Sequence, residues 1–171
     1  MMNRKITLVI IILAVIVGST AYMNLKTVEV KKELQENAEF VIKENGKEIA
    51  KLNMKEIRTL GETEFSANLK TNGKEPIRYT YTGVPLKNLF EKYGVDIKEK
   101  STLVVTAIDG YTVAVEIDKI LEDDNVYLAY MREGKSIGNR EDGGKGPYQM
   151  IISKDKISQH WCKFAVEADV K

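Results

Sequence analysis

The sequence predicts an α+β fold, rich in short antiparallel strands with a few short helices, preceded by one hydrophobic N-terminal helix. Three observations support this prediction. Short runs of alternating apolar and polar residues recur from Ala38 onward, two Asn-Gly pairs separate neighbouring runs, and helical spacing is confined to short stretches. The chain has 171 residues, 43% of them hydrophobic, which suffices for one buried core.

The N-terminal segment, residues 1–23, has the pattern of a membrane-inserting helix. Arg4 and Lys5 precede an uncharged run that extends to Met23. About 18 apolar residues approach the length needed to cross the hydrocarbon core of a bilayer. The residues up to Ala21 also suit a signal peptide that is cleaved after Ala21. An anchor and a cleaved signal both place the rest of the chain outside the cytoplasm: a polar spacer, residues 24–37, and a domain, residues 38–171.

The first part of the domain predicts two β-hairpins. Asn45-Gly46 and Asn72-Gly73 are turn pairs, because Asn and Gly tolerate the positive φ angles of a type I′ turn. The alternating runs on either side of these two turns are residues 40–42, 49–52, 65–69 and 77–81.

Three short helices are predicted. Asn53 and Glu56 have the spacing of a capping box, and Gly61 ends the first helix. Pro85 opens the second, whose apolar residues recur at helical spacing: Leu86, Leu89, Phe90 and Tyr93. The third covers residues 117–121. The remaining strands are predicted at residues 102–107, 111–115, 126–131, 148–152 and 164–170.

Charge and composition exclude several classes of function. The net charge is +1, so we expect no nucleic-acid partner, since phosphate binding needs a face of one positive sign. The chain has one Cys and one His. It therefore has no intramolecular disulfide and no His-based metal site, and we expect no bound metal.

Five segments, in order, resemble the sulfite oxidase-type molybdopterin-binding fold of the oxidoreductase molybdopterin-binding domain family. They span roughly residues 39–170 and include a "TGVPL" entry to a helix and a "DGY" turn: residues 81–90, 104–111, 126–134, 146–151 and 161–166. The resemblance implies a β-rich sulfite oxidase-type fold and a pterin or molybdopterin-like compound as the cofactor.

The chain departs from the catalytic members of that family at the metal ligand. Those members hold molybdenum through a cysteine thiolate that precedes the "TGVPL" element, where this chain has Ser66 and no Cys. A Ser hydroxyl stays protonated at neutral pH and does not replace a soft thiolate. Cys162 falls on a later strand, and Gln149 stands where the family has an Arg. The chain therefore resembles members that bind a pterin without metal on the outer side of the membrane.

The resemblance places the candidate ligand-binding residues around one cleft. A planar, hydrogen-bonding heterocycle needs aromatic faces and a few polar groups beside them. The candidate faces are Tyr111, Tyr148 and Trp161, and the candidate polar contacts are Asp109, Arg140, His160 and Lys163. The Gly-rich stretch Glu133–Gly146 is predicted as an irregular loop, either a lid over the ligand or a plain connector.

Three functions follow from these observations. The leading hypothesis is a non-catalytic extracytoplasmic protein that binds a small heterocycle such as a pterin and signals to a membrane-protein partner. The second is a molybdopterin-dependent oxidoreductase whose metal has a non-Cys ligand. The third is a ligand-free protein-interaction module.

Overall fold

The hydrophobic N-terminal run forms one long helix, α1 (Arg4–Glu36), in the computed structural model, which describes residues 4–70, 75–141 and 143–171. From Leu8 to Glu36 this helix is long and apolar enough to cross a membrane, and its residues from Leu8 to Leu34 are exposed. The predicted spacer at residues 24–37 is therefore helical almost to its end. Its sequence contains no Gly or Pro, so a helix already formed by the preceding residues propagates through it.

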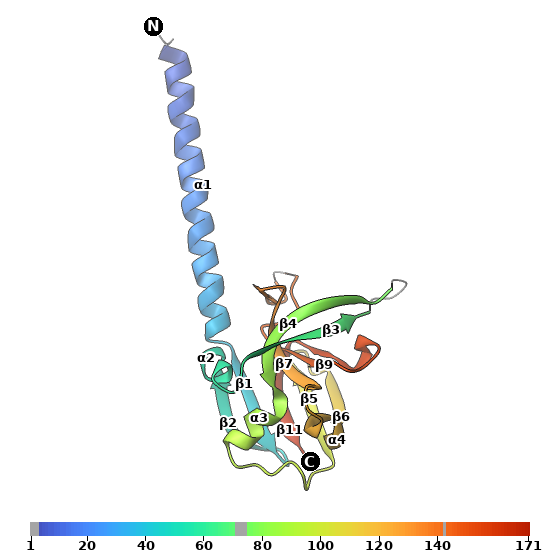
Figure 1. Cartoon of the computed structure of the whole chain (residues 1–171). Coiled ribbons are helices and arrows are strands. Elements are labelled where there is room, and N and C mark those ends of the chain that lie inside the picture. The colour runs from blue at the N-terminus through green and yellow to red at the C-terminus, as the bar shows by residue number, and fades with distance from the viewer. Residues whose placement is uncertain (1–3, 71–74, 142) are drawn as a thin grey trace. The chain divides into compact units, whose positions relative to one another are not determined.

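Residues Asn37–Lys171 form a second compact unit, built on two sheets (Figure 1). The first sheet has the order β2-β1-β11-β5-β6, and the second has the order β10-β9-β7-β4-β3, with β8 paired to β7. The strands are β1 (Glu39–Glu44), β2 (Lys47–Asn53), β3 (Thr63–Leu69), β4 (Ile77–Pro85), β5 (Thr102–Ala107), β6 (Thr112–Glu116), β7 (Val126–Arg132), β8 (Lys135–Ser136), β9 (Gln149–Ile152), β10 (Cys162–Lys163) and β11 (Ala165–Val170). Among the described strands only the β1–β11 pair is parallel, so the predicted antiparallel α+β class is confirmed.

The predicted hairpins are present. Asn45 and Gly46 have φ angles of 51° and 82° and join β1 to β2. Strands β3 and β4 pair without a break from Leu69 opposite Ile77 to Thr63 opposite Gly83. The turn predicted at Asn72-Gly73 lies outside the described residues.

The three short helices are α2 (Met54–Arg58), α3 (Leu86–Lys92) and α4 (Ile117–Leu121). Both bonds of the predicted capping box are formed: Glu56 N–H donates to Asn53 Oδ1 at 3.0 Å, and Asn53 N–H donates to Glu56 Oε2 at 2.8 Å. Tyr93, the last residue predicted at the helical spacing of α3, directly follows the helix and is partly exposed. A short 3₁₀ helix, η1 (Ser158–His160), was not predicted.

Tyrosines fill much of the core of the second unit. Tyr81, Tyr127, Tyr130 and Tyr148 are among the largest fully buried side chains. Tyr130 donates its hydroxyl hydrogen to Glu62 Oε2 at 2.5 Å, and Tyr127 donates to Asp124 Oδ1 at 3.1 Å. Tyr148 packs edge-on against Phe40 and donates to the carbonyl of Ala38 at 2.8 Å. These hydroxyls have partners, as burial requires.

Candidate functional site

A pocket of about 730 Å³ opens where the end of β3, the β5–β6 turn and the segment that leads into β10 come together. Its wall mixes apolar and polar side chains from these three places: Leu69, Lys70, Ala107, Asp109, Tyr111, Ile157, Ser158, Gln159, Trp161, Lys163 and Phe164. A concave site with a few converging polar groups is where a small ligand binds most readily.

Trp161 forms the rigid part of this wall. Its indole N–H donates to the carbonyl of Ile152 at 3.2 Å, and its ring meets Tyr81 edge-on at 5.8 Å between centroids. Only 4% of Trp161 is exposed. Trp161 is therefore both a core anchor and a pocket residue.

The β5–β6 turn supplies the exposed aromatic ring. Gly110 has a φ of 82°, which a residue with a side chain adopts only under strain, and Tyr111 N–H donates to Asp109 Oδ1 at 3.2 Å. The turn leaves Tyr111 56% exposed at the pocket. Arg140 lies at the rim, with Nη1 3.9 Å from Asp109 Oδ2 and its guanidinium 5.7 Å from the Phe164 ring.

Two lysines make the wall electropositive. Lys70 and Lys163 line the pocket, and within the described residues neither ammonium group has an ion-pair partner. Asp109 is the one carboxylate among the described residues of the wall. The wall therefore favours a ligand that carries an anionic group.

The structure brings together four of the seven predicted site residues, Asp109, Tyr111, Trp161 and Lys163, with Arg140 at the rim. Tyr148 is fully buried in the core and does not line the pocket, because it lies in the sheet interior against Phe40. His160 is exposed on η1, outside the pocket wall, with Nδ1 3.7 Å from Asp155.

Sequence reasoning missed the rest of the wall. The missed residues come from the end of β3, from Ala107 of β5 and from the segment around η1: Leu69, Lys70, Ala107, Ile157, Ser158, Gln159 and Phe164. The Ser158 hydroxyl joins two of these places, since it accepts from Lys70 N–H at 3.1 Å and donates to the Lys70 carbonyl at 3.0 Å. No local pattern indicates a bond between residues so far apart in the sequence.

Comparison with known proteins identifies the kind of domain. The model of the family described as "Oxidoreductase molybdopterin binding domain" matches residues 26–164. The chain belongs to that family. Among solved structures, it is similar to the sulfane dehydrogenase SoxCD from Paracoccus pantotrophus, with a TM-score of 0.64 and 16% identity. The match covers 80% of this chain and 38% of that one. No curated protein matches the chain.

The family name raises the question of whether this pocket suits molybdenum. Cys162 is the only thiol, and it is fully buried, with Sγ 3.9 Å from the Val105 carbonyl. Burial raises the pKa of its thiol to about 11, so the thiolate that molybdenum needs is disfavoured. Among the described residues, no group of three or more His, Cys, Asp or Glu side chains could hold a metal ion. The described wall of the pocket therefore offers no thiolate to molybdenum.

The stretch Glu133–Gly146, predicted as an irregular loop, contains the short strand β8, and its other described residues fold back on themselves next to the pocket. Within it, Gly144 N–H donates to the Asn139 carbonyl at 2.8 Å and Gly146 N–H donates to the Gly138 carbonyl at 2.7 Å. The Lys145 carbonyl then accepts from Phe164 N–H at 2.8 Å, which ties the loop to the pocket wall. The loop thus forms one edge of the site.

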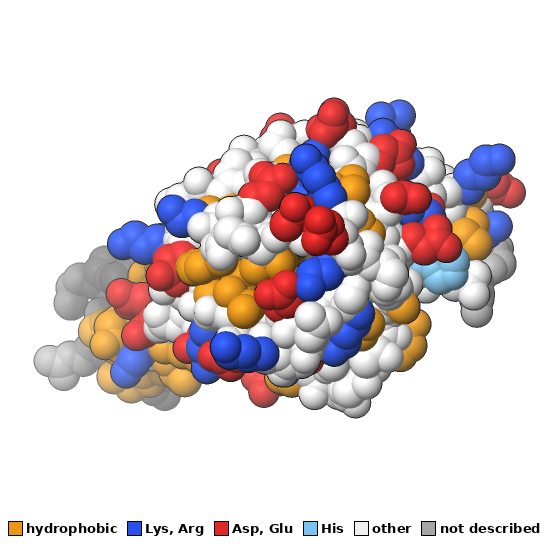
Figure 2. All heavy atoms as spheres, turned by 90° about the horizontal axis from the view of Figure 1, so that it is seen from below, with side chains coloured by type: hydrophobic (Ala, Val, Ile, Leu, Met, Phe, Trp, Pro, Cys, Tyr) orange, Lys and Arg blue, Asp and Glu red, His pale blue; other side chains and the backbone are white. Residues whose placement is uncertain are grey.

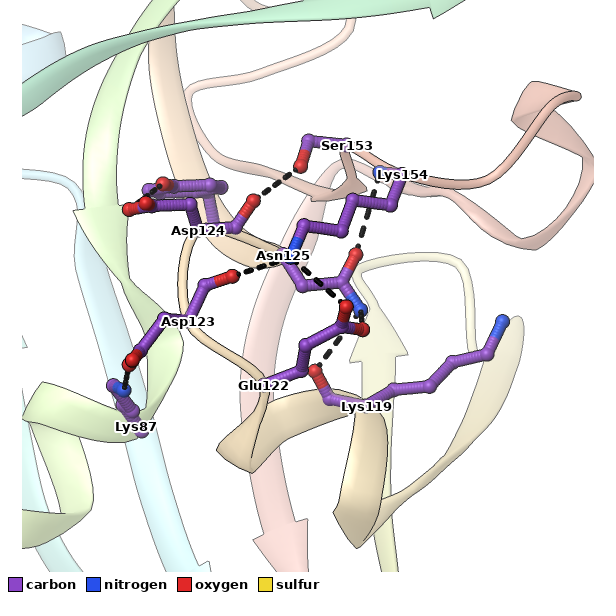
Figure 3. A network of polar contacts seen from close by, with 9 residues as sticks. Lys87, Lys119, Glu122, Asp123, Asp124, Asn125, Ser153 and Lys154 are labelled. Carbon is purple, nitrogen blue, oxygen red and sulfur yellow. Dashed lines mark hydrogen bonds and ion pairs between the residues drawn. The ribbon is translucent and has the colours of Figure 1, made fainter.

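A polar network holds Ser153 and Lys154, at the start of the segment that leads through η1 to Trp161 (Figure 3). Asn125, which is buried, donates to Glu122 and to the Lys119 carbonyl and accepts from Lys154 N–H. Lys154 Nζ donates to Glu122 Oε1 at 2.9 Å, and Ser153 donates to the Asp124 carbonyl at 2.7 Å. The acidic cluster at residues 122–124 therefore has a structural role, because it binds the start of the segment that continues to Trp161.

The face seen in Figure 2 carries Lys, Arg, Asp and Glu side chains interleaved around a small apolar area. It differs in character from the pocket wall, where neither lysine has an ion-pair partner among the residues that the structure describes.

Proposed function

We propose that this chain is a membrane-anchored, extracytoplasmic binding protein for a pterin-like heterocycle and that it performs no redox chemistry itself. The observation that carries this proposal is a pocket in a molybdopterin-binding family domain that offers an aromatic face and polar groups but no thiolate. Binding without chemistry is the function that this set of side chains can perform.

The pocket offers a contact for each part of such a ligand. Tyr111 presents a ring face for stacking, and Asp109 presents a carboxylate that accepts hydrogen bonds from ring N–H and amino groups. Lys70 and Lys163 then receive an anionic tail. Arg140, at the rim, closes onto the ligand from the loop Glu133–Gly146.

Ligand occupancy would reach a partner through that loop. Arg140 contacts Asp109 and Phe164, both of which line the pocket, so a bound ligand changes what Arg140 can touch. A ligand shifts a conformational equilibrium only if it interacts differently with the two states. Hydrogen exchange of residues 133–146 should therefore slow when the ligand binds, and equal exchange in both states would refute the lid.

The decisive experiment is to purify the full chain gently from the membranes of a host that makes molybdopterin. Released small molecules are identified by mass spectrometry, and metals are measured in the same sample. A stoichiometric pterin without molybdenum is the expected result. A protein that holds neither, even after incubation with a pterin, would favour a ligand-free interaction module.

The family match favours a second function, a molybdopterin-dependent oxidoreductase with a non-Cys ligand to the metal. Molybdenum at stoichiometry in the same sample would establish this function and refute the first. The two proposals share the pocket and differ only in the metal, so one elemental analysis separates them.

A further inference from the structure

Within the described residues, the outer edge of β6 has no partner strand. β6 is the last strand on its side of the first sheet and pairs only with β5 (Figure 1). Two bonds fix which backbone groups face β5: Ala107 N–H donates to the Tyr111 carbonyl at 2.8 Å, and Ile117 N–H donates to the Ser101 carbonyl at 3.2 Å. Inward and outward groups alternate along an antiparallel strand. The N–H and C=O of Thr112 and Ala114, and the N–H of Glu116, therefore point outward.

These outward groups are available for pairing. Thr112, Ala114 and Glu116 are exposed, and the described part of the chain supplies no hydrogen-bond partner for the outward N–H groups. Val113 and Val115 point into the core on the same strand. β6 therefore combines a free backbone edge with a continuous apolar underside.

The opposite edge of the same sheet is protected, and β6 is not. β2 carries Lys47 and Lys51, Lys51 forms an ion pair with Glu39 at 2.8 Å, and the β1–β2 register shifts after Ile42. Charged residues, Pro and bulges are the means by which natural edge strands avoid pairing. β6 has the sequence Thr-Val-Ala-Val-Glu and keeps one register with β5 throughout, so its edge is open to another strand.

We propose that β6 pairs antiparallel with β6 of a second copy of this chain, with the two-fold axis at Ala114. In that register Ala114 faces Ala114 and exchanges two hydrogen bonds with it, and each Thr112 carbonyl accepts from the other copy's Glu116 N–H. Thr112 faces Glu116 and Val113 faces Val115, so no like charges meet and the apolar layer continues across the axis. The strand is thus complementary to itself.

The contact is small and forms only where the chain is concentrated. A pair of short edge strands buries less than the roughly 1,000 Å² expected of a stable interface. Chains attached to one membrane surface reach the necessary local concentration. Tyr111, which lines the pocket, directly precedes β6, so the second copy lies beside the ligand site. The pairing itself does not depend on which ligand the pocket takes.

Cysteine cross-linking of the full chain, reconstituted in vesicles of phosphatidylethanolamine and phosphatidylglycerol, tests the register. The native Cys162 is buried, so an introduced surface Cys is the reactive thiol. Facing residues of a hydrogen-bonded pair have Cα atoms about 5.5 Å apart, within the range of a disulfide. Ala114→Cys should therefore form dimers under mild oxidation. Thr112→Cys, about 14 Å from the Thr112→Cys of the other copy, and Lys51→Cys on β2 should each give at least five-fold less.

A second pair of variants tests the backbone pairing. In the double variant Thr112→Cys/Glu116→Cys, the two thiols face each other across the axis and should cross-link. Adding Ala114→Pro removes an outward N–H that makes no hydrogen bond within the described fold, and it should lower the dimer yield at least ten-fold. Adding Ala114→Ser keeps this N–H and should not lower the yield. Equal melting temperatures for these two variants would show that the fold is intact. Cross-linking of Ala114→Cys no greater than that of Lys51→Cys, or no effect of Ala114→Pro, would overturn the proposal.

Discussion

Tyr111 and Trp161 are both aromatic residues of the pocket wall, but they contribute to different properties. Trp161 is almost fully buried and bonded to the Ile152 carbonyl, so its removal would cost about 3–5 kcal/mol of stability and obscure any effect on binding. Tyr111 is largely exposed, and its ring can be removed without opening the core. Tyr111 is therefore the residue to mutate when ligand binding is measured.

We expect Tyr111→Ala to weaken pterin binding about ten-fold, because it removes the exposed face on which the ring stacks. Its effect on the free energy of unfolding should stay within about 0.5 kcal/mol. Calorimetric titration and thermal unfolding measure the two quantities. Tyr93→Ala removes another partly exposed tyrosine away from the pocket wall and serves as the control. Equal affinities for the two variants would exclude stacking on Tyr111.

Tyr148→Phe should lower stability and leave ligand affinity unchanged, which is the reverse of Tyr111→Ala. The variant removes the hydroxyl that donates to the Ala38 carbonyl and leaves that carbonyl without this donor. The expected loss of stability is about 1–2 kcal/mol, measured by urea unfolding. Pterin affinity should not change, since Tyr148 lies outside the pocket wall. A selective loss of affinity would restore Tyr148 as a ligand-binding residue.

Cys162 makes stability depend on pH in the alkaline range. Burial, aided by the charge of Asp109, raises the pKa of its thiol from 9.0 to about 11. The folded state therefore holds this proton more tightly than the unfolded state, and the stability present below pH 9 is lost as the pH rises toward 11. Between pH 8 and pH 10 the free energy of unfolding should fall by about 1 kcal/mol more in the native chain than in Cys162→Ala. Parallel slopes for the two proteins would contradict this account.

At the scale of elements, the loop Glu133–Gly146 depends on close backbone packing. A Cβ at Gly144 would lie 2.3 Å from the carbonyl oxygens of Ile137 and Gly138. At Gly134 there is open space, and only the positive φ of 69° opposes a side chain. A substitution at Gly144 therefore tests close packing, whereas a substitution at Gly134 tests backbone strain.

Gly144→Ala should therefore lower stability by about 2–3 kcal/mol and speed hydrogen exchange across residues 137–146, because the backbone must move apart. Gly134→Ala should cost about 1 kcal/mol and leave that exchange unchanged. Urea unfolding and mass-spectrometric hydrogen exchange measure both effects. Identical exchange in the two variants would mean that the contacts of Gly144 do not hold the loop.

Elements defined by neighbouring residues could be predicted, whereas contacts between distant segments could not. The hairpin at Asn45-Gly46 and the capping box of α2 depend on residues within a few positions of each other, and both are present. The pocket wall instead needs Ser158 to bond Lys70, and it needs Tyr148 to be in the core while Tyr111 stays exposed. These contacts are set by how the sheets pack, so the resemblance to a family could not show that Tyr148 belongs to the core and that His160 lies outside the pocket wall.

At the scale of the whole molecule, α1 is the proposed membrane anchor of the domain. We expect the full chain to stay with the membrane fraction after washes at high salt and at alkaline pH, because a span of this hydropathy inserts in the bilayer. Intact-mass measurement distinguishes an anchor from a signal that is cleaved after Ala21. A chain that begins at Tyr22 and is recovered in the soluble fraction would show that the protein is secreted and not anchored.

The position of the single tryptophan gives the protein a built-in optical reporter. Trp161 is held rigidly in the pocket wall by its bond to Ile152, and the chain contains no other indole to add background. A conjugated heterocycle bound within van der Waals distance of this wall would quench the indole emission by energy or electron transfer. Ligands could then be screened by fluorescence on the unlabelled native chain, and the change in emission would come from the pocket itself.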